Sequence, residues 1–166
     1  MPRVVYFCCL LILLVASRAL AVEPNLEVIY GSRKLTFDAT KLASLAWSEV
    51  EAADMGRTQR YRAVPVSELL KEVKAPLGEE LRGPALALVV RAKASDGYAV
   101  VYSLAEFEPA FRTRPIYLVD QQNGKPLSPS AGPLRLLCPG DSRGARGIRQ
   151  LVSLEIISLA ETNSVK

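Results

Sequence analysis

The apolar positions of this chain recur mainly with a period of two, in short runs rich in valine, isoleucine and aromatic residues. This pattern is typical of β-strands. Residues 26–30 (LEVIY) and 34–37 (KLTF) flank the turn pair Gly31–Ser32, and the arrangement predicts a β-hairpin. The run 85–91 is almost continuously apolar and predicts a strand buried on both faces. Further strands are predicted at 47–51, 99–102, 116–119, 134–138 and 151–157.

A helix with one buried face is predicted over 66–73, where apolar residues follow the spacing i, i+3, i+4 and i+7. These residues are Val66, Leu69, Leu70 and Val73. Pro76 and Gly78 end this helix. Residues 38–45 allow a helical turn capped by Asp38 or Thr40, and the polar stretch 52–60 is predicted to be a loop.

A short helix is predicted after Ser103, because a serine followed three residues later by Glu106 forms a capping box. Its apolar residues are expected to point inward: Leu104, Phe107 and Phe111. Pro109 keeps the helix brief.

The expected strands outnumber the helices and do not alternate regularly with them, which favours an α+β domain built on a mixed β-sheet over a doubly wound α/β fold. No linker or repeat divides residues 22–166, so we expect one domain there.

The N-terminal residues have the pattern of a secretory signal peptide. Arg3 precedes an apolar run over 4–16, and Ala19-Leu20-Ala21 provides a cleavage site. We expect cleavage after Ala21 and a periplasmic or secreted protein without a membrane span; the alternative is a retained anchor helix. Cys8 and Cys9 would leave with the signal, and Cys138 alone cannot form an intrachain disulfide.

The charge and composition exclude several classes of function. The formal net charge is +4, of which two charges, Arg3 and Arg18, belong to the expected signal peptide. The remaining basic residues are dispersed and lack interleaved aromatic side chains, which argues against nucleic-acid binding. The chain has no histidine, so a Ser-His-Asp triad, a His-ligated zinc site and a histidine pH switch are excluded.

Three arginines, Arg143, Arg146 and Arg149, are spaced by threes and interrupted by Gly144 and Gly147. Guanidinium groups match phosphate oxygens, and glycines let backbone N–H groups approach an anion closely. The pattern therefore indicates an anion-binding loop, and the alternative is a solvated basic loop without a ligand.

Four motifs between Ser95 and Ile157 occur in the order DGY (96–98), NGKPL (123–127), GPLRLLCPG (132–140) and GARGIRQL (144–151). This series resembles the C-terminal half of the sulfite-oxidase-type molybdopterin-binding domain. Residues 61–73 (YRAVPVSELLKEV) are weakly similar to the preceding part of that domain. The resemblance implies the mixed-sheet α+β fold of that family.

The resemblance also implies roles for single residues. Arg146 and Arg149 match the positions that hold the phosphate end of the molybdopterin, although Gln150 replaces the usual tryptophan. Arg135 matches the arginine of the preceding strand, and Tyr98 matches a tyrosine near the substrate oxyanion. A half-buried strand tyrosine is the alternative for Tyr98. The candidate cofactor-binding residues are Tyr98, Asn123, Arg135, Arg143, Arg146 and Arg149.

One departure concerns the molybdenum ligand, which in the family is a cysteine thiolate in the N-terminal half. The matching region, 47–60 (WSEVEAADMGRTQR), has no cysteine, and its carboxylates are harder ligands that do not replace a thiolate. Cys138 occupies a strand position and is expected to pack in the core; the alternative is a reactive thiol and a thiol-dependent enzyme. No catalytic residue and no independent metal site are assigned.

We therefore expect an exported, oxidoreductase-like protein that binds a pterin cofactor or another anionic ligand, with reduced or absent oxo-transfer activity. A periplasmic redox or signalling protein is the expected partner. The alternative is a non-enzymatic binding module on the same scaffold, which exposed apolar surface near Trp47 and Tyr61 would favour.

Overall fold

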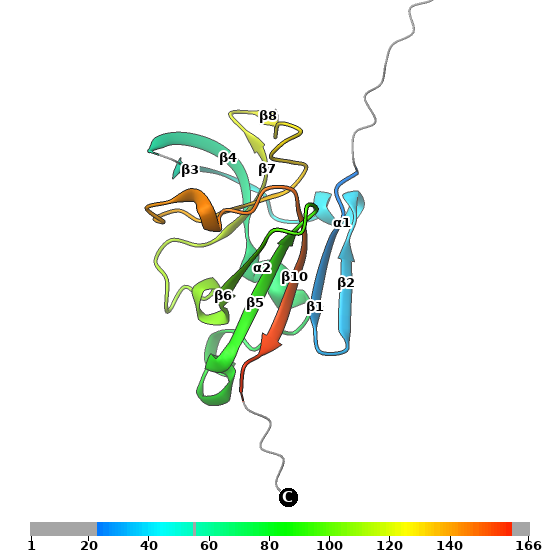
Figure 1. Cartoon of the computed structure of the whole chain (residues 1–166), viewed down its shortest axis with the longest axis vertical. Coiled ribbons are helices and arrows are strands. Elements are labelled where there is room, and N and C mark those ends of the chain that lie inside the picture. Colours follow the sequence, from blue (N-terminus) through cyan, green and yellow to red (C-terminus); the bar gives the residue numbers. More distant parts are fainter. Residues whose placement is uncertain (1–22, 55, 161–166) are drawn as a thin grey trace, which may run out of the picture.

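The structure is a computed structural model that describes residues 23–54 and 56–160. The expected signal peptide, with Cys8 and Cys9, lies outside the described residues. The described strands form two five-stranded β-sheets, which Figure 1 shows with sheet A in front and sheet B above it.

Sheet A joins the two ends of the described chain. Its strand order is β2 (Arg33–Phe37), β1 (Leu26–Tyr30), β10 (Leu151–Ser158), β5 (Leu88–Ala94) and β6 (Ala99–Ser103). Strands β1 and β10 are parallel, whereas all other neighbours are antiparallel. The predicted hairpin at 26–37 is thus confirmed, and the sheet is mixed as expected.

Sheet B is antiparallel throughout. It contains β3 (Ser48–Asp54), β4 (Arg57–Pro65), β7 (Tyr117–Gln122) and β8 (Lys125–Pro126), with β9 (Arg135–Leu137) also paired to β7. The prediction of a loop at 52–60 is wrong, because β3 and β4 pair through this segment. Among its described residues, Ala52 is buried and packs with Tyr61, whereas the others are exposed or half-buried, so the segment lacks the strong apolar alternation that marks a strand.

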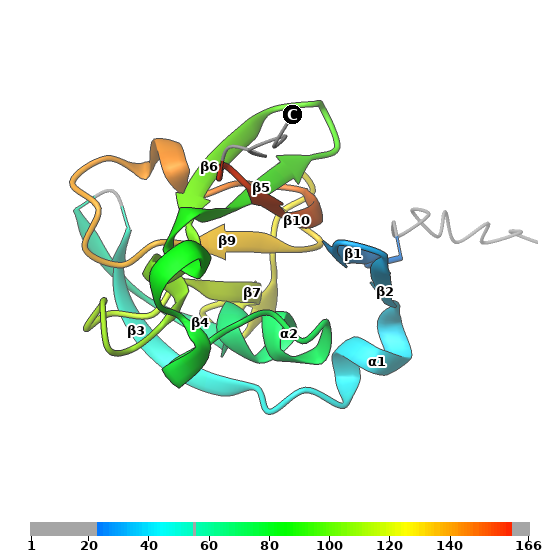
Figure 2. The same cartoon turned by 90° about the horizontal axis from the view of Figure 1, so that it is seen from below.

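Two short α-helices lie on one side of sheet A (Figures 1 and 2). Helix α1 (Ala39–Ala43) is capped by Asp38, whose carboxylate accepts a hydrogen bond from the Lys41 N–H at 2.8 Å. Helix α2 (Val66–Glu72) confirms the helix predicted at 66–73, and its apolar face is fully buried. No helix in the described part of the chain is long and apolar enough to cross a membrane.

Four 3-10 turns complete the chain: η1 (Gly78–Glu80), η2 (Gly83–Ala87), η3 (Leu104–Phe107) and η4 (Gly144–Arg146). The capping box at Ser103 and Glu106 is confirmed, but it opens the 3-10 turn η3. Phe111, expected to point inward, is exposed because the chain has already left η3 before Pro109.

The strand expected at 85–91 begins only at Leu88, since η2 occupies the residues before it. The prediction that this strand is buried on both faces is wrong. Leu88, Val90, Ala92 and Ala94 alternate with more exposed residues, because no layer covers the outer face of sheet A there.

The main core lies between sheet A, α2 and the inner side of sheet B, and a smaller cluster lies around Tyr61. Tyr61 is fully buried and Trp47 is half-buried, with its indole N–H donated to the Leu42 carbonyl at 2.7 Å. These two aromatic residues therefore do not form the exposed apolar surface expected of a docking module.

Candidate anion-binding site

The loop from β9 to β10, residues 138–150, is termed the pocket loop. Its glycine-rich part runs beside β6 and the β3–β4 hairpin (Figures 1 and 2). Gly140 has φ +93°, which side-chain-bearing residues rarely adopt. A Cβ on Gly147 would lie 3.1 Å from the Leu136 carbonyl oxygen and 3.3 Å from that of Gly144. Glycine at these positions lets the loop turn and return close to β9.

A cavity of about 250 Å³ lies between the pocket loop and the β3–β4 hairpin. Its lining consists of Ala53, Gly56, Arg114, Arg135, Leu137, Cys138, Gly140, Asp141, Ser142, Arg143, Gly144 and Gly147. Three of these residues are arginines and one is a carboxylate. The lining is therefore positively charged, and its glycines expose backbone to the cavity.

Among the described residues of the lining, the one carboxylate is that of Asp141, and two arginines from outside the lining neutralise it. Its oxygens accept hydrogen bonds from Arg146 Nε at 2.8 Å and from Arg112 Nη2 at 3.3 Å. These bonds, above all the one from Arg146, hold the pKa of Asp141 below its ordinary value. Asp141 is therefore not free to offset the positive charges of Arg114 and Arg143, which also line the cavity.

Glu106 completes an arginine–carboxylate cluster of four residues: Glu106, Arg112, Asp141 and Arg146. Glu106 is bound by Arg112 Nη1 at 3.2 Å and by Arg146 Nη1 at 3.1 Å. Each carboxylate thus contacts both guanidinium groups, and all four side chains are partly shielded from water, with exposures between 16% and 35%. The cluster ties η3 and the segment after it to the pocket loop.

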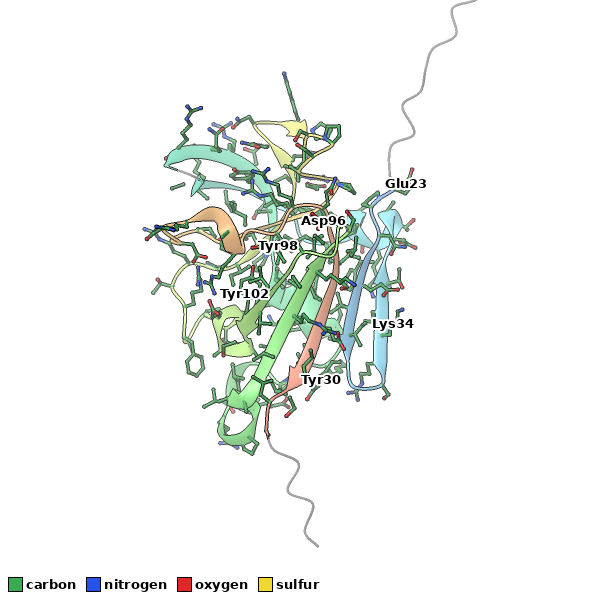
Figure 3. All side chains as sticks on the ribbon, viewed as in Figure 1. Glu23, Tyr30, Lys34, Asp96, Tyr98 and Tyr102 are labelled. Carbon is green, nitrogen blue, oxygen red and sulfur yellow. The ribbon has the colours of Figure 1, made fainter. Side chains whose placement is uncertain are left out.

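Two tyrosines from the β6 region also hold the pocket loop, and Figure 3 shows both beside it. Tyr98 donates its hydroxyl hydrogen to the Ala145 carbonyl at 2.8 Å, and Tyr102 donates to the Arg146 carbonyl. Burial raises the pKa of Tyr102, so this donor stays protonated. Two consecutive carbonyl groups of η4, those of Ala145 and Arg146, are therefore held by hydrogen bonds from tyrosines.

The structure brings only two of the six predicted site residues together in the cavity lining, Arg135 and Arg143. Arg146 is engaged in the arginine–carboxylate cluster, and Tyr98 reaches the loop from its outer side. Arg149 is exposed outside the cavity lining.

Asn123, also predicted to bind the cofactor, lies in the turn between β7 and β8. Its amide donates to Gln59 Oε1 at 2.6 Å and its carbonyl oxygen accepts from the Arg60 N–H at 3.1 Å. These contacts hold the β7–β8 turn against β4, and Asn123 does not line the cavity.

Sequence reasoning missed Arg114 of the lining and three residues of the cluster, Glu106, Arg112 and Asp141. The dense charges of the segment 112–114 (RTR) before a predicted strand were the available signal for Arg112 and Arg114. Glu106 was recognised only as a capping residue, a role it also has.

Cys138 lies at the edge of the cavity but is almost fully buried, with 9% of its surface exposed. Its sulfur is 3.6 Å from the Tyr102 hydroxyl oxygen, and burial raises the pKa of the thiol. We expect Cys138 to react with iodoacetamide at neutral pH at least about tenfold more slowly than an exposed cysteine, since the thiolate is the nucleophile.

Peptide mapping by mass spectrometry measures the alkylation of Cys138 in the native and denatured protein. Cysteine introduced by Leu159→Cys, at a position with 65% exposure, provides the matched control within the same chain. Equal rates for Cys138 and this control would revive the hypothesis of a thiol-dependent enzyme.

The donor set fits an anionic group better than a thiolate-bound metal. The β3–β4 hairpin, where the resemblance places the molybdenum ligand, contains no cysteine. In the described ranges, no group of three or more Cys, His, Asp or Glu side chains could hold a metal ion. The arginines of the lining instead suit the oxygens of a phosphate group.

Comparison with protein-family models finds no match, and no curated protein sequence matches the chain. Among solved structures, the crystal structure of the sulfane dehydrogenase SoxCD from Paracoccus pantotrophus is similar, with a TM-score of 0.61 and 16% sequence identity. The likeness covers 82% of this chain and 39% of that chain, so this chain spans about two fifths of its length. It is a likeness of fold, and it confirms the α+β class with mixed sheet and few short helices.

Proposed function

We propose that this protein is an anion-binding domain on an oxidoreductase-like fold, and that its cavity holds the phosphate group of a pterin cofactor or a free oxyanion of the same chemistry. The observation that carries the proposal is the cavity lined by Arg114, Arg135 and Arg143, where the carboxylate found among the described residues, Asp141, is neutralised from outside. The fold shared with a sulfane dehydrogenase supports it.

The size of the cavity limits which ligands, or parts of ligands, it can enclose. Pockets that enclose drug-sized molecules have volumes of roughly 300–1,000 Å³. A cavity of about 250 Å³ is smaller, but it can accept a phosphate group. If the ligand is molybdopterin, its phosphate end would occupy the cavity and its ring system would extend beyond it.

The residues of the lining would act on the ligand in two ways. Arg114 and Arg143 would donate charge-assisted hydrogen bonds to phosphate oxygens, and Arg135 would add positive charge. Such a cofactor, when bound, supplies the redox chemistry. The protein's own part is to bind the phosphate and to hold the pocket loop in place.

The missing cysteine favours a protein with reduced or absent oxo-transfer activity, or a binding module without catalysis. Export to the periplasm or the exterior, with a redox or signalling protein as partner, is part of the same proposal and rests on the N-terminal sequence pattern. Whether the protein retains some oxo-transfer activity or is a binding module without catalysis, the proposed ligand of the cavity is the same kind of anion.

The decisive experiment is to express the chain with its own N-terminal segment in a host that makes molybdopterin, purify it, and measure molybdenum and pterin per chain. Titration calorimetry with inorganic phosphate is run on the same preparation. We expect saturable phosphate binding to protein free of pterin, because the lining contributes three guanidinium groups.

The outcomes distinguish a pterin cofactor from a free oxyanion as the ligand. Pterin bound near one per chain would identify a cofactor domain, with or without molybdenum. Phosphate binding in protein that purifies without pterin would identify a module for a free oxyanion. A well-folded protein that holds no pterin and binds no phosphate contradicts the proposal.

A further inference from the structure

Strand β6 (Ala99–Ser103) forms one edge of sheet A and pairs only with β5. The Ala94 N–H donates to the Tyr98 carbonyl at 2.8 Å, so Ala94 and Tyr98 are a hydrogen-bonded pair. Such pairs alternate with non-hydrogen-bonded pairs in an antiparallel ladder. Val100 and Tyr102 therefore bond to β5, and the backbone groups of Ala99, Val101 and Ser103 point away from it.

The capping box confirms this orientation independently. The Ser103 N–H donates to Glu106 Oε1 at 3.2 Å, on the side away from β5. No described residue pairs with the outward N–H and C=O groups of Ala99 and Val101. The edge thus offers four backbone groups on two alternate residues, and η3 limits its length.

The edge of β6 also lacks the features that prevent edge strands from pairing. Such features are charged side chains, proline and very short strands. The opposite edge of sheet A, β2, carries Arg33 and Lys34; in sheet B, β3 carries Glu49 and Glu51, and β8 has two residues and ends in Pro126. Strand β6 (AVVYS) has none of these, and its Val101 is 55% exposed.

We propose that two copies of this chain pair through β6 in an antiparallel, twofold-symmetric arrangement with Val100 opposite Val100 of the second copy. In this register Ala99 of each copy faces Val101 of the other. These two hydrogen-bonded pairs use all four outward groups of each edge. The two copies of sheet A then form one continuous sheet.

The neighbouring register is disfavoured by the contacts of Ser103. A pairing centred on Val101 would place Ala99 opposite Ser103 of the second copy, whose N–H is already bound by Glu106. Only the arrangement centred on Val100 leaves the capping box intact and satisfies the outward groups.

The charges next to the edge are compatible with a symmetric pair. On the outer face of β5, Arg91 is bound to Glu155, and Lys93 lies beside Ala99. Across the proposed seam, Lys93 of one copy is three strand spacings, roughly 14 Å, from Arg91 of the other. This exceeds the Debye length of about 8 Å at physiological ionic strength, so their repulsion is largely screened.

Sedimentation velocity of the purified full chain over a range of concentrations tests the proposal. We expect a concentration-dependent dimer, and we expect Val101→Lys to weaken it at least about tenfold, because it places like charges at the seam. Thr36→Lys adds the same charge to an exposed position on the opposite edge and is the matched control. A monomer at every concentration, or a dimer that Val101→Lys leaves intact, overturns the proposal.

Cysteine cross-linking tests the register. Directly opposite residues of a non-hydrogen-bonded pair have Cβ atoms about 4.5–5.5 Å apart, close enough for a disulfide with slight adjustment. Val100→Cys is expected to cross-link two copies under mild oxidation, whereas Val101→Cys, offset from its own symmetry mate, is expected to cross-link far less. The reverse order contradicts the register. Neither test depends on anion binding, so the dimer and the proposed function can fail separately.

Discussion

Replacing Asp141 by asparagine is expected to lower the free energy of unfolding by about 2 kcal/mol at neutral pH. The substitution keeps the side-chain shape but removes the charge that both Arg112 and Arg146 contact. Breaking a fully buried ion pair costs about 3–5 kcal/mol, whereas an exposed pair contributes about 0–1 kcal/mol. Asp141 has a side-chain exposure of 16%, which places it between these limits. Urea unfolding of the variant and the unchanged protein measures the difference.

The matched control is Glu49→Gln, which removes a carboxylate 3.9 Å from Arg60 in a pair that is exposed on both sides. Its expected effect is below about 0.5 kcal/mol, because water screens the pair. Equal effects of the two substitutions would show that the arginine–carboxylate cluster does not stabilise the fold.

The pH dependence of the free energy of unfolding gives a second test of the stabilising role of Asp141. Its pKa in the folded protein is lowered from an ordinary value of 3.8. The contribution of its charge to the free energy of unfolding is therefore fully present above that pH. The contribution is lost as the pH falls through the folded-state pKa, where protonation removes the charge in both states. The stability difference between the unchanged protein and Asp141→Asn should therefore be constant above about pH 5 and shrink below pH 3.8.

The double substitution Arg114→Ala and Arg143→Ala is expected to weaken phosphate binding by at least about a hundredfold. Both side chains line the cavity, and they come from different segments of the chain. Hydrogen bonds to charged groups contribute about 1.5–3 kcal/mol each, which corresponds to about tenfold or more for each arginine. Titration calorimetry at fixed ionic strength gives the affinities of the single and double variants.

Arg33→Ala combined with Arg82→Ala removes the same charge from exposed positions that do not line the cavity. We expect this control to change the affinity by less than about threefold, because screening limits charge effects over distance. Similar losses in both double variants would mean that net charge, and not the cavity, attracts the anion.

Arg146 illustrates why a basic motif does not by itself define an anion site. The segment GARGIRQL suggested that this arginine binds phosphate, but its guanidinium contacts Asp141 and Glu106. The pKa of Arg146 is raised mainly by the hydrogen bond to Asp141. In the structure this residue fixes the shape of the pocket loop, and it neutralises the carboxylate that would otherwise repel an anion.

The sequence alone determined the features that depend on neighbouring residues. The hairpin at 26–37, the apolar face of helix α2 and the capping box at Ser103 follow from local periodicity and from side-chain bonds within four residues. The α+β class followed from the number and order of these elements. The arginine and glycine content of the pocket loop indicated an anion-binding segment before its geometry was known.

Only the tertiary structure decided which arginines line the cavity, since this depends on residues that are distant in the chain. Arg114 reaches the pocket loop from the segment before β7, and Glu106 forms an ion pair with Arg146, which is 40 residues away in the sequence. Periodicity also could not locate the β3–β4 hairpin, because its outer face is solvated and only a few residues are buried. Charge pairing and burial of this kind are set by long-range contacts, which a local pattern does not encode.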